Sequence, residues 1–266
     1  MKKIVPIILI SLLAMQTVQA QGDTTSYARR PFQFTFLFPP LSTNGAKNAI
    51  IVNDVSLNLF LGVSGGVEVF ELAGFINIDQ YYVNGAQLAG FGNTVGGSVS
   101  GAQVAGFYNV NGTDLQGFQG AGFVNVAGAK VNGAQIAGFV NVAGDSLEGF
   151  QGAGFINVAG AASKAVQTAG FGNVAGAGPT HFQGAGFFNV AEEVHGAQVA
   201  GFINVAGNVK GTQLAGFLNI CDSIDGVPLA LISVVKKNGY RKVGFTISEV
   251  QYANLSYKMG VKRLYT

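Results

Sequence analysis

The stretch GAQVAGFINVAGNVKG, residues 196–211, recurs with variations ten times along the chain. A Gly-Phe pair marks each copy. The first pair is Gly74-Phe75, and the following pairs come at steps of 16 residues as far as Phe187, then at steps of 15. A fixed period of this length with strand-forming composition is typical of a repeat fold, in which each unit buries its apolar face only by stacking on its neighbours.

Three positions of the repeat hardly vary, and we expect each to form a column of identical side chains. Gln stands four residues before each Phe, with Glu71 in its place in the first copy. The Phe column comprises Phe75, Phe91, Phe107, Phe123, Phe139, Phe155, Phe171, Phe187, Phe202 and Phe217. The Asn column, two residues after each Phe, comprises Asn77, Asn93, Asn109, Asn125, Asn141, Asn157, Asn173, Asn189, Asn204 and Asn219. Stacked in register, the rings would form an interior stack, and the Asn and Gln amides would pass hydrogen bonds from unit to unit.

The composition of each unit favours strands over helices. Several Gly per unit and β-branched residues between them are unfavourable in a helix, whereas short strands separated by Gly-rich corners fit well. The sequence therefore predicts an all-β fold, a β-solenoid of about ten 15–16-residue coils stacked roughly 4.8 Å apart, with β caps and a C-terminal β-hairpin segment.

Two further regularities support stacked coils. Phe118, Phe150 and Phe182 lie five residues before a Gly-Phe Phe, and each is followed two residues later by Gly. Positions two apart share a face of a strand, so we interpret these pairs as large and small residues packed in the core. The change of step from 16 to 15 falls in the variable segment before Gly196, where a corner tolerates it.

An antiparallel meander or a membrane barrel is the competing architecture. The 32-residue spacing of Phe118, Phe150 and Phe182 would suit a hairpin period. Antiparallel neighbours run in opposite directions, however, so identical residues would generally not face one another. An antiparallel arrangement therefore does not explain the invariant columns.

The chain divides into four segments. Residues 1–20 resemble a cleaved secretory signal, with Lys2 and Lys3 before a short apolar run; a membrane anchor is the alternative. Residues 21–66 form an extended segment and cap, residues 67–225 the repeat domain, and residues 226–266 a C-terminal β-strand segment.

The C-terminal segment has two interpretations. Asn238-Gly239 suits the turn of a hairpin joining VPLALISVV to YRKVGFTIS. These strands either cap the solenoid or are the opening strands of an outer-membrane barrel, with Tyr252, Tyr257 and Tyr265 as interface aromatics.

The GAQVAGFINVAG pattern, with SLNLFLGVSGGVEVFELAGFINI before the repeats and VPLALISVVKKNGYRK and SEVQYANLSYKMGVKRLY after them, resembles a bacterial surface-repeat family over about residues 31–266. The resemblance implies a secreted, envelope-associated β-repeat protein in the periplasm, outer membrane or cell surface. Members often continue into further strands that look like an outer-membrane barrel. The family supplies no reaction and no catalytic residues.

Residues able to carry chemistry are sparse and scattered. His181 stands where most coils have a corner Gly, and His195 lies in the variable corner beside Glu192 and Glu193. The single Cys221 excludes an intramolecular disulfide. Acidic pairs do not recur at matching positions, and no nucleophile, phosphate or dinucleotide motif is present. We therefore expect no enzyme, no cofactor and no metal.

The charge distribution bears on partners. Residues 67–225 contain ten acidic residues against three lysines, which disfavours nucleic acid. Two classes remain: a structural or binding module presenting amide ladders to an unknown protein or glycan at the cell surface, or part of an outer-membrane or other membrane-embedded assembly. The outward face discriminates between them, because ladders of amides and Gly suit water, whereas lipid needs an uninterrupted apolar band and aromatic girdles. The column after each Phe, represented by Ile76 and Val140, bears on this choice: if it faces outward, it is an exposed apolar patch and therefore a docking surface or a lipid face.

Overall fold

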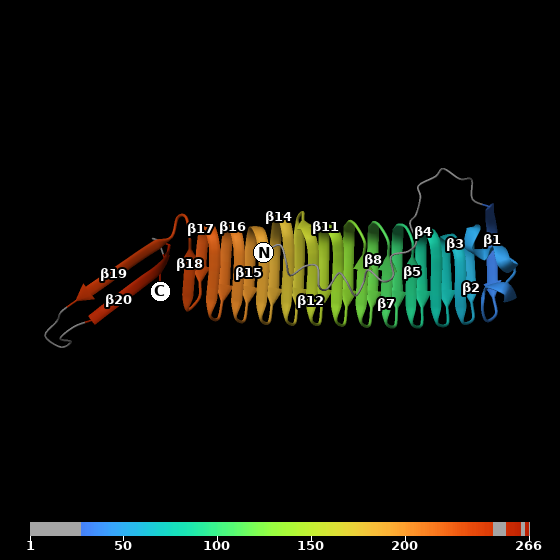
Figure 1. Ribbon diagram of the computed structural model, residues 1–266, viewed down its shortest axis with the longest axis horizontal. Helices are drawn as coiled ribbons and strands as arrows, with labels where there is room; N and C mark the ends of the chain where they lie inside the picture. Colours follow the sequence, from blue (N-terminus) through green and yellow to red (C-terminus); the bar gives the residue numbers. More distant parts are fainter. Residues whose placement is uncertain (1–27, 247–253, 262–263, 266) are drawn as a thin grey trace.

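The computed structural model describes residues 28–246, 254–261 and 264–265, and shows a straight rod of stacked β coils with a hairpin projecting from one end (Figure 1). The rod is a β-solenoid with about 16 residues per turn, as the repeat predicts, and it has about 12 turns where the repeat predicts about ten. The signal-peptide prediction, residues 1–20, lies outside the described residues. No helix in the described ranges is long and apolar enough to cross a membrane.

The strands of the rod pair in parallel with the equivalent strands of the next coil, so the antiparallel alternative is wrong for the repeats. These strands are β1 (Ala28–Thr35), β2 (Ile51–Asn58), β3 (Leu61–Ala73), β4 (Ile76–Ala89), β5 (Gly92–Val95), β6 (Val99–Ala105), β7 (Tyr108–Asn111), β8 (Leu115–Ala121), β9 (Val124–Ala127), β10 (Val131–Ala137), β11 (Val140–Ala153), β12 (Ile156–Ala162), β13 (Ala165–Ala169), β14 (Gly172–Ala185), β15 (Phe188–Ala200), β16 (Ile203–Ala215), β17 (Leu218–Leu229) and β18 (Ile232–Val235).

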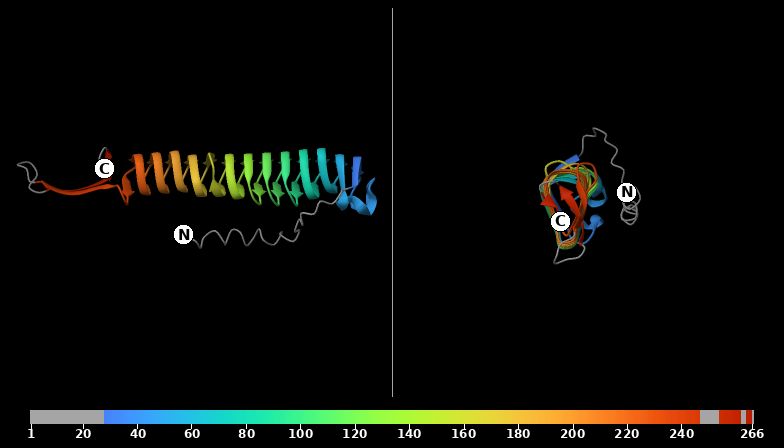
Figure 2. Two further views of the ribbon diagram at one scale, coloured as in Figure 1. Left: turned by 90° about the horizontal axis from the view of Figure 1, so that it is seen from above. Right: turned by 90° about the vertical axis from the view of Figure 1, so that its left-hand side faces the viewer.

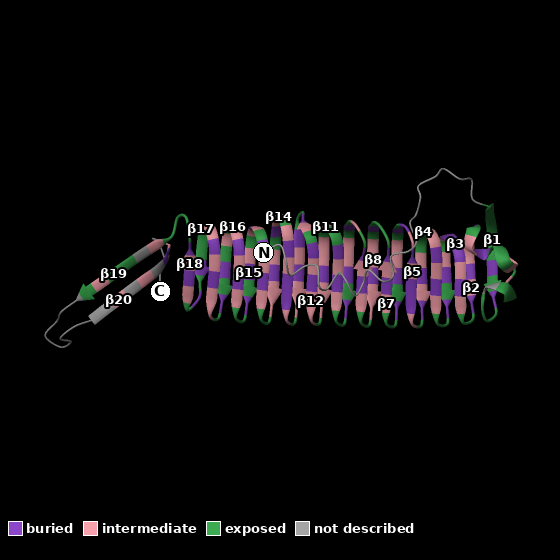
Figure 3. Cartoon of the chain, viewed as in Figure 1, coloured by how far each residue is buried: buried purple, intermediate pink, exposed green. Residues whose placement is uncertain are grey.

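Each coil has two strand segments, one on each side of a Gly-Phe corner, and the end-on view shows the coils superposed as a narrow closed loop (Figure 2). The Gln and Asn columns stay in register from coil to coil, so that identical residues pair: Gln135 with Gln151 and Asn141 with Asn157. Side chains alternate between the interior and the surface along each strand, which produces the banding in Figure 3. We call the sheet before the Phe corner face A and the sheet after it face B.

Glycine is required where consecutive coils approach closely. Gly133 has a φ of 140°, and a Cβ at this position would lie 1.9 Å from the carbonyl oxygen of Gly117 in the preceding coil. At the Gly-Phe corner, a Cβ on Gly138 would lie 2.1 Å from the oxygen of Gly122. The abundance of Gly therefore follows from stacking backbone directly on backbone at the corners.

The change from 16 to 15 residues per coil lies in the variable corner, as the sequence predicts. Between β14 and β15 the register shifts within the segment from Ala175 to Phe182, while the pairings Asn173–Asn189 and Gln183–Gln198 remain aligned. The missing residue is thus removed from the variable corner, and the columns stay continuous.

Parallel coils also include residues that the sequence assigned to the flanking segments. β1 pairs with β2, and β2 pairs with β3. Two short 3-10 helices, η2 (Pro39–Leu41) and η3 (Gly45–Ile50), lie between β1 and β2.

The C-terminal hairpin forms between different strands from those expected. β18 continues the solenoid by pairing in parallel with β17, and the hairpin is made by β19 (Tyr240–Thr246) and β20 (Asn254–Val261), followed by β21 (Leu264–Tyr265). Asn238 does not sit in a hairpin turn; its amide hydrogen-bonds both backbone groups of Ile224 in the preceding coil. Val261 packs against the end of the core. Of the three tyrosines proposed as interface aromatics, Tyr252 lies outside the described residues.

Candidate interaction surface

The interior of the rod contains the amide columns. Asn77 to Asn204 and Gln87 to Gln213 are completely buried at every repeat position, together with a column of small residues such as Ala143 and aliphatic residues such as Leu147. The predicted amide ladders are present. Each Asn Nδ2 donates to the Asn Oδ1 of the next coil at 2.8–3.0 Å.

The Gln ladder runs in the opposite direction. Each Gln Nε2 donates to the Gln Oε1 of the preceding coil at 2.7–2.9 Å. The dipoles of the two ladders therefore oppose each other along the rod axis. The Gln ladder ends at Gln213, whose buried Oε1 has no partner because Pro228 occupies the next position and has no amide to donate.

The second proton of each amide joins the two sheets. Asn141 Nδ2 on face B donates to the carbonyl oxygen of Gly152 on face A at 2.7 Å, and Gln135 Nε2 on face A donates to Val142 on face B at 3.2 Å. Both hydrogens of the NH₂ group are used in this way in every Asn from Asn77 to Asn204 and in Gln135, Gln151, Gln167, Gln183 and Gln198, and this reduces the cost of burying so many polar side chains.

The Phe column is on the outside, which corrects the prediction of an interior stack. Phe75, Phe107, Phe123, Phe139, Phe187 and Phe202 are 37–42% exposed. The rings still stack along the rod, with centroids 4.7–5.1 Å apart, and the stack begins one coil earlier than expected, at Phe60. Each Phe lies in the bend between two strands. The inward and outward alternation of side chains along a strand therefore does not apply to the Phe, although the Gln before it and the Asn after it both point inward.

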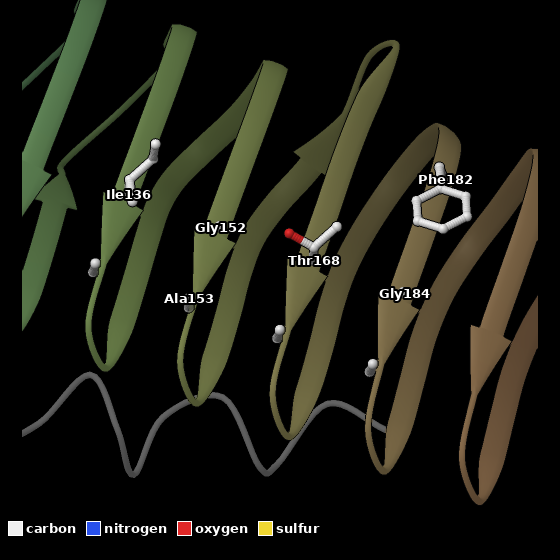
Figure 4. Close-up of a pocket in the computed structure, with 9 residues that line it drawn as sticks. Ile136, Gly152, Ala153, Thr168, Phe182 and Gly184 are labelled. Carbon is white, nitrogen blue, oxygen red and sulfur yellow. The ribbon is translucent and has the colours of Figure 1, made fainter.

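The Phe-Gly pairs five and three residues before the corner also face outward, so they are not core packing. The pairing itself is real: a Cβ on Gly120 would lie 2.8 Å from the ring of Phe118, and a Cβ on Gly152 would lie 2.9 Å from the ring of Phe150. Face A has a shallow, open hollow where Gly152 and Gly184 contribute no side chains to the row Ile136, Gly152, Thr168, Gly184, and Phe182 lies beside Gly184 (Figure 4). Its lining is aliphatic, aromatic and glycine apart from Thr168, so it offers no catalytic group.

Five outward columns together form what we call the outer apolar surface. They are the Phe column, the columns one and three residues after each Phe, and the columns three and five residues before each Phe. From Phe70 to Ile220, none of these columns contains a charged residue. Ile136 is 48% exposed, and Val140 and Val142 are half-buried. The orientation of the Ile76-type column is thereby settled, because it faces outward on face B.

The charged residues of the coils gather at the opposite edge of the rod. Lys130, Asp145, Glu148, Lys164 and Lys210 are all exposed and lie between six and nine residues after a Gly-Phe Phe. The rod is therefore amphipathic in cross-section, with a Phe edge, two apolar faces and a charged edge, while its interior holds amides.

Two carboxyl groups are the exception, because they lie inside the rod. Glu71 replaces the first Gln of its column, and Asp79 stands in a column where most later coils have Ala. Gln87 Nε2 donates to both carboxyls, Asn58 donates to Glu71, and Ser64 donates to Asp79. Burial raises the pKa of both groups, and for Asp79 the neighbouring Glu71 raises the pKa further.

Sequence reasoning noted Glu71 but missed Asp79, whose signal was its place in a column of small side chains. Asn111 occupies the same column two coils later and accepts a hydrogen bond from Gln119 in the same way, at 2.8 Å. The pair is enclosed by the coil, so it forms a feature of the core and does not line a cleft.

The remaining titratable residues are dispersed. His195 contacts Glu193 at 2.8 Å on the surface, and His181 is exposed on strand β14. Cys221 is buried in the small-residue column. Within the described ranges, no group of three or more His, Cys, Asp or Glu side chains is placed to hold a metal ion.

No family model matches this chain, and no curated protein or solved structure matches it.

Proposed function

We propose that the chain is an exported, non-enzymatic repeat protein with a structural or binding role at the cell envelope, and that the outer apolar surface is its binding surface. The observation that carries this proposal is the absence of charge from five adjacent outward columns over the length of the repeats. Monomeric soluble proteins rarely expose contiguous apolar patches larger than a few hundred Å², and larger ones mark sites of interaction.

The position of the amides narrows the choice of partner. A glycan needs donors and acceptors to replace the water around its hydroxyl groups. The Asn and Gln amides that would supply them are buried inside the rod, where they hydrogen-bond one another. A partner that is itself apolar fits this surface better.

Partition of the chain between water and a detergent phase tests the proposal. Lys would replace three exposed residues of face A, in the triple variant Val104→Lys, Ile136→Lys, Leu214→Lys. We expect the unsubstituted chain to enter the detergent phase and this variant to shift strongly toward water, with unchanged far-UV circular dichroism.

A matched control adds the same charge elsewhere. The triple variant Ser100→Lys, Gln116→Lys, Asn132→Lys uses an exposed column that already holds Lys164 and Lys210. It should partition like the unsubstituted chain. Equal partition of both triple variants would contradict the proposal.

A further inference from the structure

We infer that the partner of the outer apolar surface is a lipid leaflet, into which the rod inserts edge-on with its Phe edge in the acyl chains and its charged edge in water. This inference rests on the proposed function. It is carried by the shape and extent of the apolar surface and by the place of the charges.

The apolar surface continues around an edge and covers both faces. Ile136 and Val199 are exposed on face A, Val142 is half-exposed on face B, and the Phe stack joins the two faces. A flat partner covers one face only. Acyl chains cover both faces and the edge together.

The presence of two apolar faces argues against a second copy as the occupant. The Phe stack spans about 49 Å over ten coil steps, and face A is apolar for about 16 Å from the Phe edge at the usual rise per residue. One face therefore offers roughly 800 Å², which is about what each partner buries in a standard dimer. A dimer through one face would leave the other face exposed, and pairing through both would build an open array, because such contacts do not close.

The depth of the apolar surface fits one leaflet. It extends about 16 Å from the Phe edge on face A and about 10 Å on face B, against about 15 Å for half of the hydrocarbon core of a bilayer. The charged residues begin beyond this depth: Glu148 and Lys164 lie seven residues before the next Phe, two positions outside the apolar columns. The rod is deep enough to enter a leaflet and too shallow to span the bilayer.

Charge on the polar edge specifies the lipid. Of the ten acidic residues in residues 67–225, Glu71 and Asp79 lie inside the rod, which leaves eight against three lysines at its surface. This part of the rod therefore gains nothing from an anionic headgroup. Insertion here is driven by apolar burial, and a zwitterionic phosphatidylcholine bilayer suffices.

The natural chain has no Trp, so a single introduced Trp reports its own depth. Phe139→Trp places it in the Phe stack, and Glu148→Trp places it on the charged edge. Each full-length variant is mixed with vesicles of phosphatidylcholine brominated along the acyl chains, because bromine quenches Trp on contact. A local readout also separates insertion of the rod from any contribution of residues 4–15.

We expect several-fold stronger quenching and a blue-shifted emission for Phe139→Trp, and emission for Glu148→Trp unchanged from that in water. Quenching of neither residue, or equal quenching of both, would overturn the inference. If Phe139→Trp is not quenched while detergent partition still depends on face A, the lipid inference fails and the proposed function stands. If Phe139→Trp is not quenched and detergent partition does not depend on face A, both the lipid inference and the proposed function are wrong.

Discussion

The amide ladders and the Phe ladder are equally invariant in the sequence, yet they lie on opposite sides of the same backbone. Asn141 is completely buried and joined to its neighbours by hydrogen bonds, whereas Phe139, two residues away, is 38% exposed and joined to its neighbours by ring stacking. Repetition of a residue therefore shows that it stacks on itself, and does not show that it is in the core.

The two ladders also differ in what a substitution would remove. A buried amide column depends on every member, because each lost side chain strands a donor on one side and an acceptor on the other. A surface ring column loses only contact area, since water can fill the gap. We expect the interior ladder to determine stability and the outer ladder to determine binding.

The largest effect is expected at the interior ladder. Asn141→Ala leaves Asn157 Oδ1 and the Gly152 carbonyl without their donor. At about 1–3 kcal/mol for each stranded buried group, the repeats should lose roughly 2–5 kcal/mol of unfolding free energy. Chemical denaturation followed by circular dichroism measures this loss. A change below 0.5 kcal/mol would mean that the ladder is not a structural requirement.

A smaller loss of stability and a larger loss of binding are expected at the Phe ladder. Phe139→Ala removes two ring contacts, with Phe123 and Phe155, each contributing about 0.5–1.5 kcal/mol. Vesicle flotation should weaken for this variant and stay unchanged for Asn141→Gln, provided that variant folds. Unchanged flotation of Phe139→Ala would remove the Phe edge from the binding surface.

The buried carboxyl pair gives the interior a pH dependence that the other coils lack. Because burial raises the pKa of Glu71 and Asp79, both keep their protons when folded at pH values where the unfolded chain ionises. Their contribution to stability is complete in acid, below their ordinary values, and is lost as the pH rises through the folded pKa values.

The variant Asp79→Asn reproduces the arrangement that Asn111 already has with Gln119. It should stabilise the first coils at pH 8, because a neutral amide avoids the cost of ionising a buried carboxyl, and flatten the pH dependence above pH 4. Backbone hydrogen exchange of β3 and β4, compared at pH 5 and pH 8 with correction for intrinsic rates, checks both effects. Greater stability of the unsubstituted chain at pH 8 than at pH 5 would contradict the sign.

The smallest effect is expected at the charged edge. Lys130→Ala and Glu148→Ala remove exposed side chains, and we expect changes within about 0.5 kcal/mol in unfolding free energy. Detergent partition should also be unchanged. Thermal denaturation and phase partition of the two variants together test whether this edge is inert in both respects.

The repeat alone was sufficient to predict the coil, its register and the amide ladders. A constant spacing forces identical residues such as Asn125 and Asn141 to pair, whatever the environment of the side chains. It did not predict the orientation of Phe139, because a bend of two residues interrupts the alternation that places Gln135 and Asn141 inside. Because aromatic rings are usually found in the core, the sequence favoured an interior position for the Phe column, and this prediction was wrong.

Two other features required information that the repeat does not contain. The hairpin expected at Asn238-Gly239 has suitable turn residues, but β18 gains more by continuing the columns of β17 through pairs such as Ile232 with Leu218. The Glu71–Asp79 pair joins two columns that are eight residues apart, and only the closed cross-section of the coil brings them together.

Amides fill the rod and apolar side chains cover it. Cysteine labelling tests this arrangement of side chains most directly. Burial raises the pKa of the native Cys221 to about 11, and Cys221→Ala supplies a thiol-free background that matches the Ala of the preceding coils. In that background, Val142→Cys faces outward and Ala143→Cys faces inward. We predict rapid maleimide labelling of Val142→Cys in the folded protein, and labelling of Ala143→Cys only after denaturation. The reverse order would contradict the arrangement of the rod.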